Sequence, residues 1–582
     1  MGSRLSLLRF LRPYRRWAIL APAFMALEVA MDLMMPKLVQ GIVDRAIATS
    51  DQTLVLQYGA AMLGATLIAL VGGIACSINA VIAAQSFGTD LRRALYQKVQ
   101  SLSFGNLDKS ETGTLVTRLT NDVTQVQDMV LMVLRGMVRA PLLLFGSLIM
   151  ATITSPRLAV LFFVLIPLVL GFLIFIVRRT YPIFGEVQRR LDGLNTRLQE
   201  NLAGVRVVKA FARSEFERQR FGETNANLRD KNVVTARFGA VTGPFMTLTL
   251  NAGVVAALWI GGNHVSQGDM SVGQIIAFVN YLTQTLVSLM FVSMLVTQFS
   301  RAGASAERIE QVFQTEATVP PATATSFPSL GQGRVAFENV SFRYEDGEDV
   351  LCDVSFVAEP GQTLAILGAT GSGKSTLVNL IPRFYDPSSG RVTLDGVDLR
   401  NIDETQLRRR VAVVLQESVL FSGTIRDNIR YGKPDASDEE VAEASRIAQA
   451  EEFIARFPEG YDTIVGQRGV NLSGGQKQRL AIARALLVRA EVLILDDSTS
   501  AVDVRTEAKI QEGMSHLAEG QTRIIVAQRI RSVMNAEKIL VLDDGKLVAQ
   551  GTHSELLRDS AVYREISQSQ TPKTEEVAHA NA

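Results

Sequence analysis

The chain has 582 residues, of which 47% are hydrophobic and 20% are charged, and its formal net charge is +1. Soluble globular chains carry roughly 25% charged residues, so this composition excludes a disordered, fibrous or wholly soluble protein. The balanced charge provides no basic field that would attract nucleic acid, and we expect no nucleic-acid partner. Two cysteines and four histidines are too few for a disulfide framework and argue against a metal enzyme.

Apolar residues concentrate in the first half of the chain. The tracts 54–89 and 238–268 contain no Asp, Glu, Lys or Arg, and 140–177 contains only Arg157. A membrane-spanning helix needs about 20 apolar residues. The pattern therefore predicts six transmembrane helices, near residues 17–43, 56–82, 134–154, 158–177, 240–262 and 272–296.

The charges between these spans predict their orientation. The turns 46–53 and 262–270 contain no Lys or Arg, whereas five arginines precede the first span. By the positive-inside rule, both termini face the cytoplasm. We expect residues 1–16 to form an amphipathic helix on the inner membrane surface, because no short apolar core with a cleavage site follows the arginines.

The cytoplasmic parts of the chain are long. Segments 84–133 and 178–239 have helix-rich compositions, and helical pairs of that length extend about 40 Å from the membrane. Further along, Pro320-Pro321 and an Ala/Thr/Ser run predict a linker, after which short apolar strands alternate with helical patterns, as in an α/β domain. The expected parts are the amphipathic helix 1–16, a transmembrane domain 17–300, a linker 301–333, an α/β domain 334–568 and a disordered tail 569–582.

A phosphate-binding loop follows an apolar strand at residues 363–367. The segment from Gly368 to Ser375 fits the pattern G-x-x-x-x-G-K-[ST], in which backbone N–H groups wrap phosphates at a helix N-terminus. Lys374 would reach the β- and γ-phosphates, and the Ser375 hydroxyl would bind Mg²⁺. The sequence therefore predicts an ATP and Mg²⁺ site that contains Gly368, Ala369, Thr370, Gly371, Ser372, Gly373, Lys374, Ser375 and Thr376.

Two further segments complete the predicted phosphate chemistry. A second strand, 492–495, ends in Asp496, which is suited to hold Mg²⁺ through water. Between the two strands, a Ser-Gly-Gly segment opens a helix and forms another phosphate cradle. Its residues are Leu472, Ser473, Gly474, Gly475 and Gln476. Because there is one P-loop and one such cradle, two cassettes facing head-to-tail would complete each other's sites.

Six spans, a P-loop and the Leu472–Gln476 signature together resemble the ATP-binding cassette (ABC) exporter family, with nearly the whole chain matching a half-transporter. The resemblance implies a membrane α-helical domain with six transmembrane helices fused to an α/β P-loop ATPase domain. It implies ATP hydrolysis coupled to export of hydrophobic or amphipathic compounds, such as drugs, lipids or peptides. It also implies contact with membrane lipids and a location in the bacterial inner membrane, with the nucleotide-binding domain in the cytoplasm.

The resemblance assigns roles to individual residues. Tyr344 matches the aromatic residue that stacks on adenine, and Gln416 matches the glutamine that senses the γ-phosphate and Mg²⁺. Asp503 matches the last residue of the D-loop. Segments 112–122 and 204–211 resemble the family's coupling segments.

Two positions depart from the family pattern. Asp497 stands where the family has the glutamate that activates water, and Gln528 stands where it has the switch histidine. An aspartate carboxylate is about 1 Å or more short of that water, a misplacement that can cost roughly a hundredfold. Glutamine is neutral and cannot relay a proton as histidine can. The pair predicts a slow ATP site in this chain.

An intact signature beside a weakened site predicts a heterodimer. The partner would be a different half-transporter that carries the glutamate and histidine, while this chain's signature completes the partner's site. A homodimeric lipid flippase and a regulatory, non-transporting membrane ATPase are the alternatives. In the first span, Glu28 and Asp32 lie on one helical face, either to recognise cationic substrates or to pair with arginines such as Arg135 and Arg139.

Overall fold

The structure is a computed structural model that describes residues 7–320, 322, 331–345, 347–517 and 520–570. The chain forms two compact units. One comprises Met1–Gln100 and Thr112–Gln314, and the other comprises Ser101–Glu111 and Thr315–Ala582. Much of the expected linker and most of the expected tail lie outside the described residues, as do residues 1–6 of the expected amphipathic helix.

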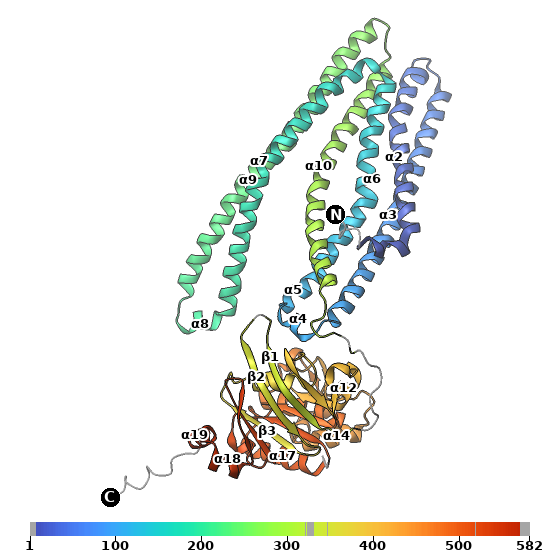
Figure 1. Ribbon diagram of the computed structural model, residues 1–582. Coiled ribbons are helices and arrows are strands. Elements are labelled where there is room, and N and C mark those ends of the chain that lie inside the picture. The colour runs from blue at the N-terminus through green and yellow to red at the C-terminus, as the bar shows by residue number, and fades with distance from the viewer. Residues whose placement is uncertain (1–6, 321, 323–330, 346, 518–519, 571–582) are drawn as a thin grey trace. The chain divides into compact units, whose positions relative to one another are not determined.

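The first unit is helical (Figure 1). Six of its helices are long and apolar enough to cross a membrane within the described residues, which confirms the predicted number of spans. The elements are η1 (Leu8–Tyr14), α2 (Arg15–Gly41), η2 (Ile42–Ile47), α3 (Gln52–Gln100), α5 (Thr112–Thr117), η3 (Arg118–Asp122), α6 (Val123–Thr154), α7 (Pro156–Ala203), α8 (Val205–Ala210), α9 (Ser214–Ser266) and α10 (Val272–Gln314).

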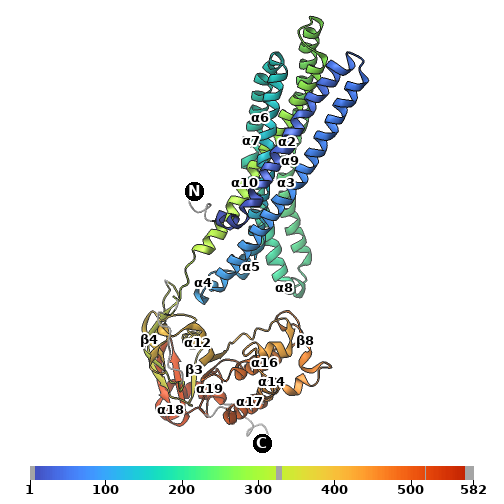
Figure 2. The same ribbon diagram turned by 90° about the vertical axis from the view of Figure 1, so that its right-hand side faces the viewer.

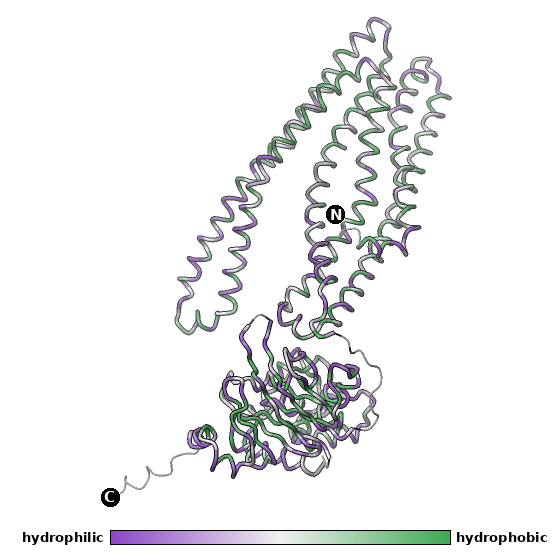
Figure 3. The backbone as a smooth tube through the Cα atoms, in the orientation of Figure 1, coloured by the Kyte–Doolittle hydropathy of each residue, from purple (hydrophilic) through white to green (hydrophobic). Residues whose placement is uncertain are grey.

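The spans continue into polar extensions. Figure 3 shows α7 and α9 changing from hydrophobic to hydrophilic towards α8, which lies at their shared end. Between α6 and α7 the chain turns at Ser155, whose side chain accepts a hydrogen bond from the Leu158 amide, with Pro156 at the first helical position. Ser at the cap and Pro at the next position favour the start of a helix.

The last helix runs further than predicted. The expected linker begins at residue 301, but α10 continues to Gln314. Ala306, Ile309 and Val312 recur at helical spacing and are buried in the core formed with α2, α3 and α6. Arg308 donates to Asp122, which is 3% exposed. Burial of this apolar stripe and the ion pair keep the segment helical.

The second unit contains the α/β domain. A six-stranded sheet has the order β12-β11-β3-β10-β9-β6, parallel except for β12, and a four-stranded antiparallel sheet has the order β2-β1-β4-β5. The strands are β1 (Val335–Arg343), β2 (Asp349–Ala358), β3 (Thr363–Gly368), β4 (Ser389–Leu394), β5 (Val397–Asp398), β6 (Val411–Val414), β7 (Gly423–Thr424), β8 (Ile464–Val465), β9 (Val492–Asp496), β10 (Thr522–Val526), β11 (Lys538–Asp543) and β12 (Lys546–Gly551).

Helices cover these sheets and form a separate lobe. In Figure 2, α14 and α16 lie with β8 on one side of the unit, away from β4. The helices are α4 (Phe104–Asp108), α11 (Lys374–Asn379), η4 (Leu399–Asn401), α12 (Glu404–Arg410), α13 (Ile425–Arg430), α14 (Asp438–Ile447), α15 (Glu451–Ile454), η5 (Gly460–Asp462), η6 (Gln467–Gly469), α16 (Gly474–Val488), α17 (Val504–Leu517), η7 (Ile530–Ser532), α18 (His553–Asp559) and α19 (Ala561–Gln570).

The order of the parallel strands positions the predicted ATP site. β10 lies between β3 and β9, so the carboxyl ends of these three strands meet at one edge. β3 leads into the P-loop, β9 ends at Asp496, and β10 ends two residues before Gln528. In open α/β sheets, ligands bind at this edge.

Candidate functional site

The P-loop joins β3 to α11. Gly373 precedes the helix with φ of +93°, and a Cβ there would lie 2.9 Å from the Val350 carbonyl oxygen, so only glycine fits without strain. Lys374 follows, 8% exposed, and its Nζ donates to the carbonyl oxygens of Gly368 at 2.9 Å and Ala369 at 2.7 Å. Burial lowers the pKa of Lys374, and the nearby Asp496 and Asp497 partly oppose that shift.

The predicted Mg²⁺ ligands face each other. The Ser375 hydroxyl donates to Asp496 Oδ1 at 3.1 Å, and burial raises the pKa of Asp496 against the effect of that hydrogen bond. The described residues contain no group of three His, Cys, Asp or Glu side chains that could hold a metal. Mg²⁺ commonly takes one or two protein oxygens, with waters and phosphate oxygens supplying the rest, so these donors fit it.

The two departures from the family pattern are in contact. Gln528 Nε2 donates to Asp497 Oδ2 at 3.1 Å. The Asp497 amide donates to the Val526 carbonyl at 3.1 Å, and its φ of 45° is a left-handed conformation that aspartate tolerates. Burial raises the pKa of Asp497, with Lys374 and Arg529 acting in the opposite direction.

A cavity of about 370 Å³ gathers most of the predicted ATP-binding residues. Val350 and Val526 also line it, and the sequence did not point to them. The predicted residues on its wall are Thr370, Gly371, Gly373, Lys374, Ser375, Thr376, Gln416, Asp496, Asp497 and Gln528. Of the remaining loop residues, Gly368 ends β3, and Ala369 and Ser372 lie between β3 and α11. The size of the cavity is in the range of small-molecule sites.

Tyr344 lies beside this cavity rather than in its wall. Its hydroxyl is 3.1 Å from Thr376 Oγ1 in α11, and its ring meets those of Phe342 and Tyr385 edge-on, with centroids 4.8 and 5.4 Å away. The side chain is 40% exposed and lines a neighbouring cavity of about 860 Å³. An exposed ring tied to the P-loop helix is compatible with stacking on a base.

The signature motif caps α16. Ser473 Oγ accepts from the Gln476 amide at 3.3 Å, and Gln476 Oε1 accepts from the Ser473 amide at 2.8 Å. This capping box follows the buried Leu472 and leaves the first turn of the helix in the geometry that binds anions. A Cβ on Gly475 would lie 2.8 Å from the Ala501 carbonyl oxygen, whereas one on Gly474 would meet only the Ala501 Cβ at 3.6 Å.

The D-loop packs on the signature helix. Gln478 of α16 donates to Ser500 Oγ at 3.1 Å and accepts from the Ala501 amide at 2.9 Å. Asp503 accepts from the Thr506 amide at 3.0 Å and so caps α17. The signature and the D-loop therefore form one rigid region, and Asp503 has a structural role whatever else it contacts.

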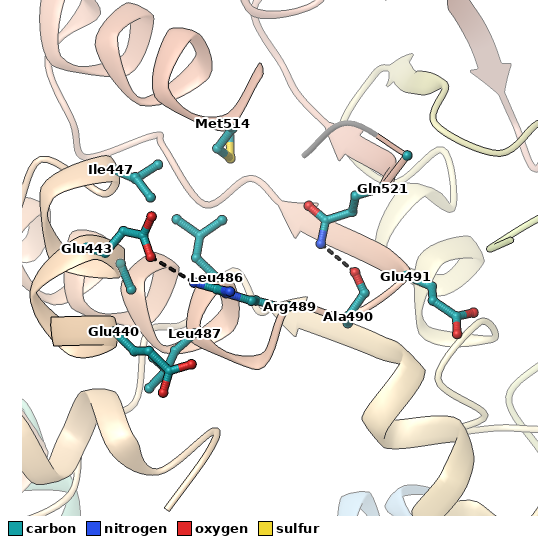
Figure 4. A pocket seen from close by; sticks show the side chains of 12 residues that line it. Glu440, Glu443, Ile447, Leu486, Leu487, Arg489, Ala490, Glu491, Met514 and Gln521 are labelled. Carbon is teal, nitrogen blue, oxygen red and sulfur yellow. Dashed lines mark hydrogen bonds and ion pairs between the residues drawn. The ribbon is translucent and has the colours of Figure 1, made fainter. Parts of the chain in front are cut away.

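Another cavity in the same unit lies away from these residues. It measures about 300 Å³ and is lined by residues such as Glu443, Met514 and Gln521 (Figure 4). Arg489 pairs with Glu443 at 2.8 Å, and Gln521 Nε2 donates to the Ala490 carbonyl at 2.6 Å. Ala490 precedes β9, so this cavity lies at the strand end opposite the P-loop and holds no predicted site residue.

A docked helix was missed by the sequence reasoning. Helix α4 belongs to the second unit although the flanking helices belong to the first. Phe104 stacks on Phe384 with centroids 4.2 Å apart, Tyr385 donates its hydroxyl hydrogen to Asp108, and Lys109 pairs with Glu345 at 2.8 Å. The Ser103–Asn106 capping box could have predicted the helix, but not its docking site.

In the first unit, Arg139 lies between the two carboxylates of the first span. It pairs with Glu28, and its Nη2 donates to Asp32 Oδ2 at 3.0 Å. The prediction that these acids pair with an arginine is confirmed for Arg139. All three side chains, with Arg135, line a cavity of about 880 Å³ between α2, α3 and α6.

Comparisons with known proteins agree with this architecture. Residues 18–289 match the ABC transporter transmembrane region, and residues 351–500 match the ABC transporter domain. The uncharacterized ABC transporter ATP-binding protein YfiB of Bacillus subtilis is 43% identical over 564 residues, 97% of this chain and 98% of that protein. The fatty acid ABC transporter ATP-binding/permease protein of Mycobacterium bovis is 38% identical over 477 residues, 82% of this chain and 75% of that protein.

A solved structure extends the match to three dimensions. The structure of a bacterial Atm1-family ABC exporter with ATP bound has a TM-score of 0.81 and 28% identity to this chain, covering 97% of it and 99% of the exporter. The expected fold class is therefore confirmed. The chain belongs to the ABC transporter family and is an exporter half-transporter, a multi-pass membrane protein whose ABC domain couples ATP hydrolysis to transport.

Proposed function

We propose that this half-transporter works in a heterodimer, in which its own P-loop site turns over slowly and its signature completes the competent site of a different subunit. The observation that carries the proposal is the hydrogen bond from Gln528 Nε2 to Asp497 Oδ2. The two positions that would handle the attacking water are bonded to each other. This contact occupies one oxygen of the Asp497 carboxylate with the side-chain NH₂ group of Gln528. That group can neither take up nor relay the proton of the attacking water.

Binding is proposed to remain intact at the same site. Lys374 and the P-loop amides would hold the ATP phosphates, and Ser375, Gln416 and Asp496 would hold Mg²⁺, which supplies charge neutralisation on the phosphate oxygens. Tyr344 would stack on adenine. The cavity at the ends of β3, β9 and β10 supports this binding role, because ten of the predicted residues line it.

The partner's site would use this chain's signature half. The capping box of Ser473 and Gln476 orients the first amides of α16, and Gly475 lets that helix approach the D-loop. A helix N-terminus directed at a phosphate stabilises negative charge that develops in the transition state. The catalytic glutamate and switch histidine would come from the partner subunit.

The proposed cargo is hydrophobic or amphipathic, taken from the cytoplasm or the inner leaflet. The apolar spans and the 38% identical relative described as a fatty acid transporter support a lipid-like compound. A homodimeric flippase and a regulatory membrane ATPase are the competing accounts. The ATPase assay below separates the homodimer from the heterodimer, and vectorial transport in proteoliposomes with the partner separates an exporter from a regulator.

The test is the ATPase rate of this chain purified alone and with its candidate partner, in each case with the partner's catalytic glutamate intact or changed to glutamine. We expect activity only with the partner, and its loss when that glutamate is changed. The matched change in this chain, Asp497→Asn, should lower the ATPase rate of the pair by less than about twofold. The site that it affects already turns over slowly and contributes little to the total rate. Rapid turnover by this chain alone would instead favour the homodimer.

A further inference from the structure

We propose that the cavity between α2, α3 and α6 binds the anionic headgroup of an amphiphile, a carboxylate or a phosphate, with Arg135 as its ligand. This inference rests on the proposed transport of amphipathic compounds and narrows their class. The cavity measures about 880 Å³, within the range of sites for drug-sized ligands. It lies among membrane spans, where ionisable residues usually serve a function.

Two of the three acids that line the cavity, Glu28 and Asp32, are already neutralised in part. Arg139 reaches both Glu28 and Asp32, and the three side chains are 41%, 16% and 33% exposed. The Glu28 carboxylate lies against Gly73, where a Cβ would be 3.0 Å from Glu28 Oε2. Glu28 thus packs between α2 and α3 while it pairs with Arg139, so it is less available than a free carboxylate to receive a cationic group.

Arg135 differs from Arg139. It lies four residues earlier on α6, on the same helical face, and it lines the cavity as an exposed side chain. Among the residues that the structure describes, no hydrogen bond or ion pair joins its guanidinium. Asp128, on the same wall, lies seven residues earlier on α6, and among the described residues no ion pair or hydrogen bond joins it to Arg135.

The rest of the wall fits a hydrocarbon chain. Leu70, Ile74 and Ile78 follow one face of α3 at a spacing of four residues, and each is more than half exposed. A guanidinium binds carboxylate or phosphate with two parallel hydrogen bonds, and such bonds are strong where water is scarce. The cavity thus combines one available cation with an apolar stripe, the arrangement that an anionic amphiphile requires.

The proposal is tested by equilibrium binding to the full-length chain, co-purified with its partner in lipid nanodiscs without ATP. The probes are dansyl-undecanoic acid, its neutral methyl ester and an alkylammonium analogue. Arg135→Gln should weaken binding of the acid by about ten- to a hundredfold, and Arg135→Lys by less. Arg178→Gln is the matched control, because Arg178 lies on α7 and does not line this cavity.

Several outcomes would overturn the proposal. Equal binding of the acid to Arg135→Gln and Arg178→Gln would do so. The proposal would also be overturned if the methyl ester bound the wild-type chain as tightly as the acid. That comparison does not depend on whether any variant folds. The cationic alternative predicts that the alkylammonium probe binds more tightly than the acid and that Glu28→Gln weakens it. On our proposal, Glu28→Gln releases part of the Arg139 charge and leaves binding of the acid equal or stronger.

The nanodisc lipid identifies the source of the anion. Competition by an anionic phospholipid, added to a phosphatidylcholine disc, would assign the site to a lipid phosphate, and binding unaffected by that lipid would assign it to a free amphiphilic acid. Because these measurements use no ATP, their failure is distinct from a failure of ATP-driven transport with the partner, which would count against the proposed function instead.

Discussion

The two halves of the ATP machinery in the second unit differ in kind. In the P-loop half, Asp497 and Gln528 replace the residues that the family uses to handle water, and they bond to each other at 3.1 Å. In the signature half, Ser473, Gly475 and Gln476 keep the family pattern, and a capping box and a close approach to Ala501 hold them. The P-loop half thus departs from the family pattern at two positions, whereas the signature half follows it.

The location of the change is informative. Lys374, Ser375 and Asp496, which would hold phosphate and Mg²⁺, are unaltered and line one cavity with the altered pair. On the proposed assignment, different side chains carry nucleotide binding and water activation, so we expect the two to be separable by mutation. We expect perturbations of the signature half to have the larger effect on the heterodimer's rate.

The largest effect is expected from Gly475→Val. The Cβ of the new side chain would lie 2.8 Å from the Ala501 carbonyl oxygen. This contact is too close, so backbone atoms must move. Displacement of α16 by about 1 Å should lower the heterodimer's ATPase rate roughly a hundredfold. ATP binding to this chain's P-loop should persist. Gly222→Ala is the control, because a Cβ there has nothing within 4 Å. If the ATPase rate of Gly475→Val equalled that of the control, the signature half would not have the role that distinguishes it from the P-loop half.

A gain of function is expected in the other half. The double change Asp497→Glu with Gln528→His restores both family residues at once. With the partner's own catalytic glutamate changed to glutamine, turnover at this chain's site should rise by roughly tenfold or more, the usual contribution of a positioned general base. Single-turnover hydrolysis of labelled ATP measures it. No increase would show that the slow step lies elsewhere than in these two side chains.

Much of this comparison could be predicted from the sequence, for a physical reason. Strand-loop-helix motifs such as Gly368–Ser375 carry their own local geometry, and parallel strands bring Asp496 and Gln528 to the same edge. The six spans follow from hydropathy alone. The sequence predicts a last span near 272–296 and a linker from residue 301, whereas α10 continues to Gln314. The extension buries only a narrow apolar stripe around Ile309, so its mean hydropathy gives no sign of the helix.

The contacts that could not be predicted join distant parts of the chain. Nothing local links Phe104 to Phe384, or Asp108 to Tyr385, since the pairs are far apart in sequence and their contact depends on the tertiary fold. The same holds for Arg139, which the sequence offered only as one of two candidate partners for Glu28. Long-range pairs of this kind need the structure.

A smaller effect is expected where α4 docks on the P-loop half. Tyr385→Phe keeps the ring beside Tyr344 but removes the hydroxyl that bonds Asp108. The exposed bond contributes about 1 kcal/mol, so substrate-stimulated ATPase should fall a few-fold while ATP affinity is retained. Tyr181→Phe, at a 79% exposed tyrosine of α7, is the control. An unchanged ratio of stimulated to basal rate would show that α4 does not couple to this half.

ATP binding is also expected to depend on pH through Lys374. Burial lowers the pKa of this lysine from its ordinary value of 10.5, so the free protein loses the ammonium proton at lower pH than an ordinary lysine does. Phosphate charges favour the protonated form, so binding then requires proton uptake, and affinity should fall by up to about tenfold per pH unit above the lowered pKa. Titrations of ATP affinity between about pH 8 and 10 measure this fall. Lys374→Arg should flatten the profile, because arginine stays protonated throughout that range. A wild-type profile as flat as the arginine variant's would mean that Lys374 of the free protein stays protonated throughout this range, which would contradict a pKa lowered by burial.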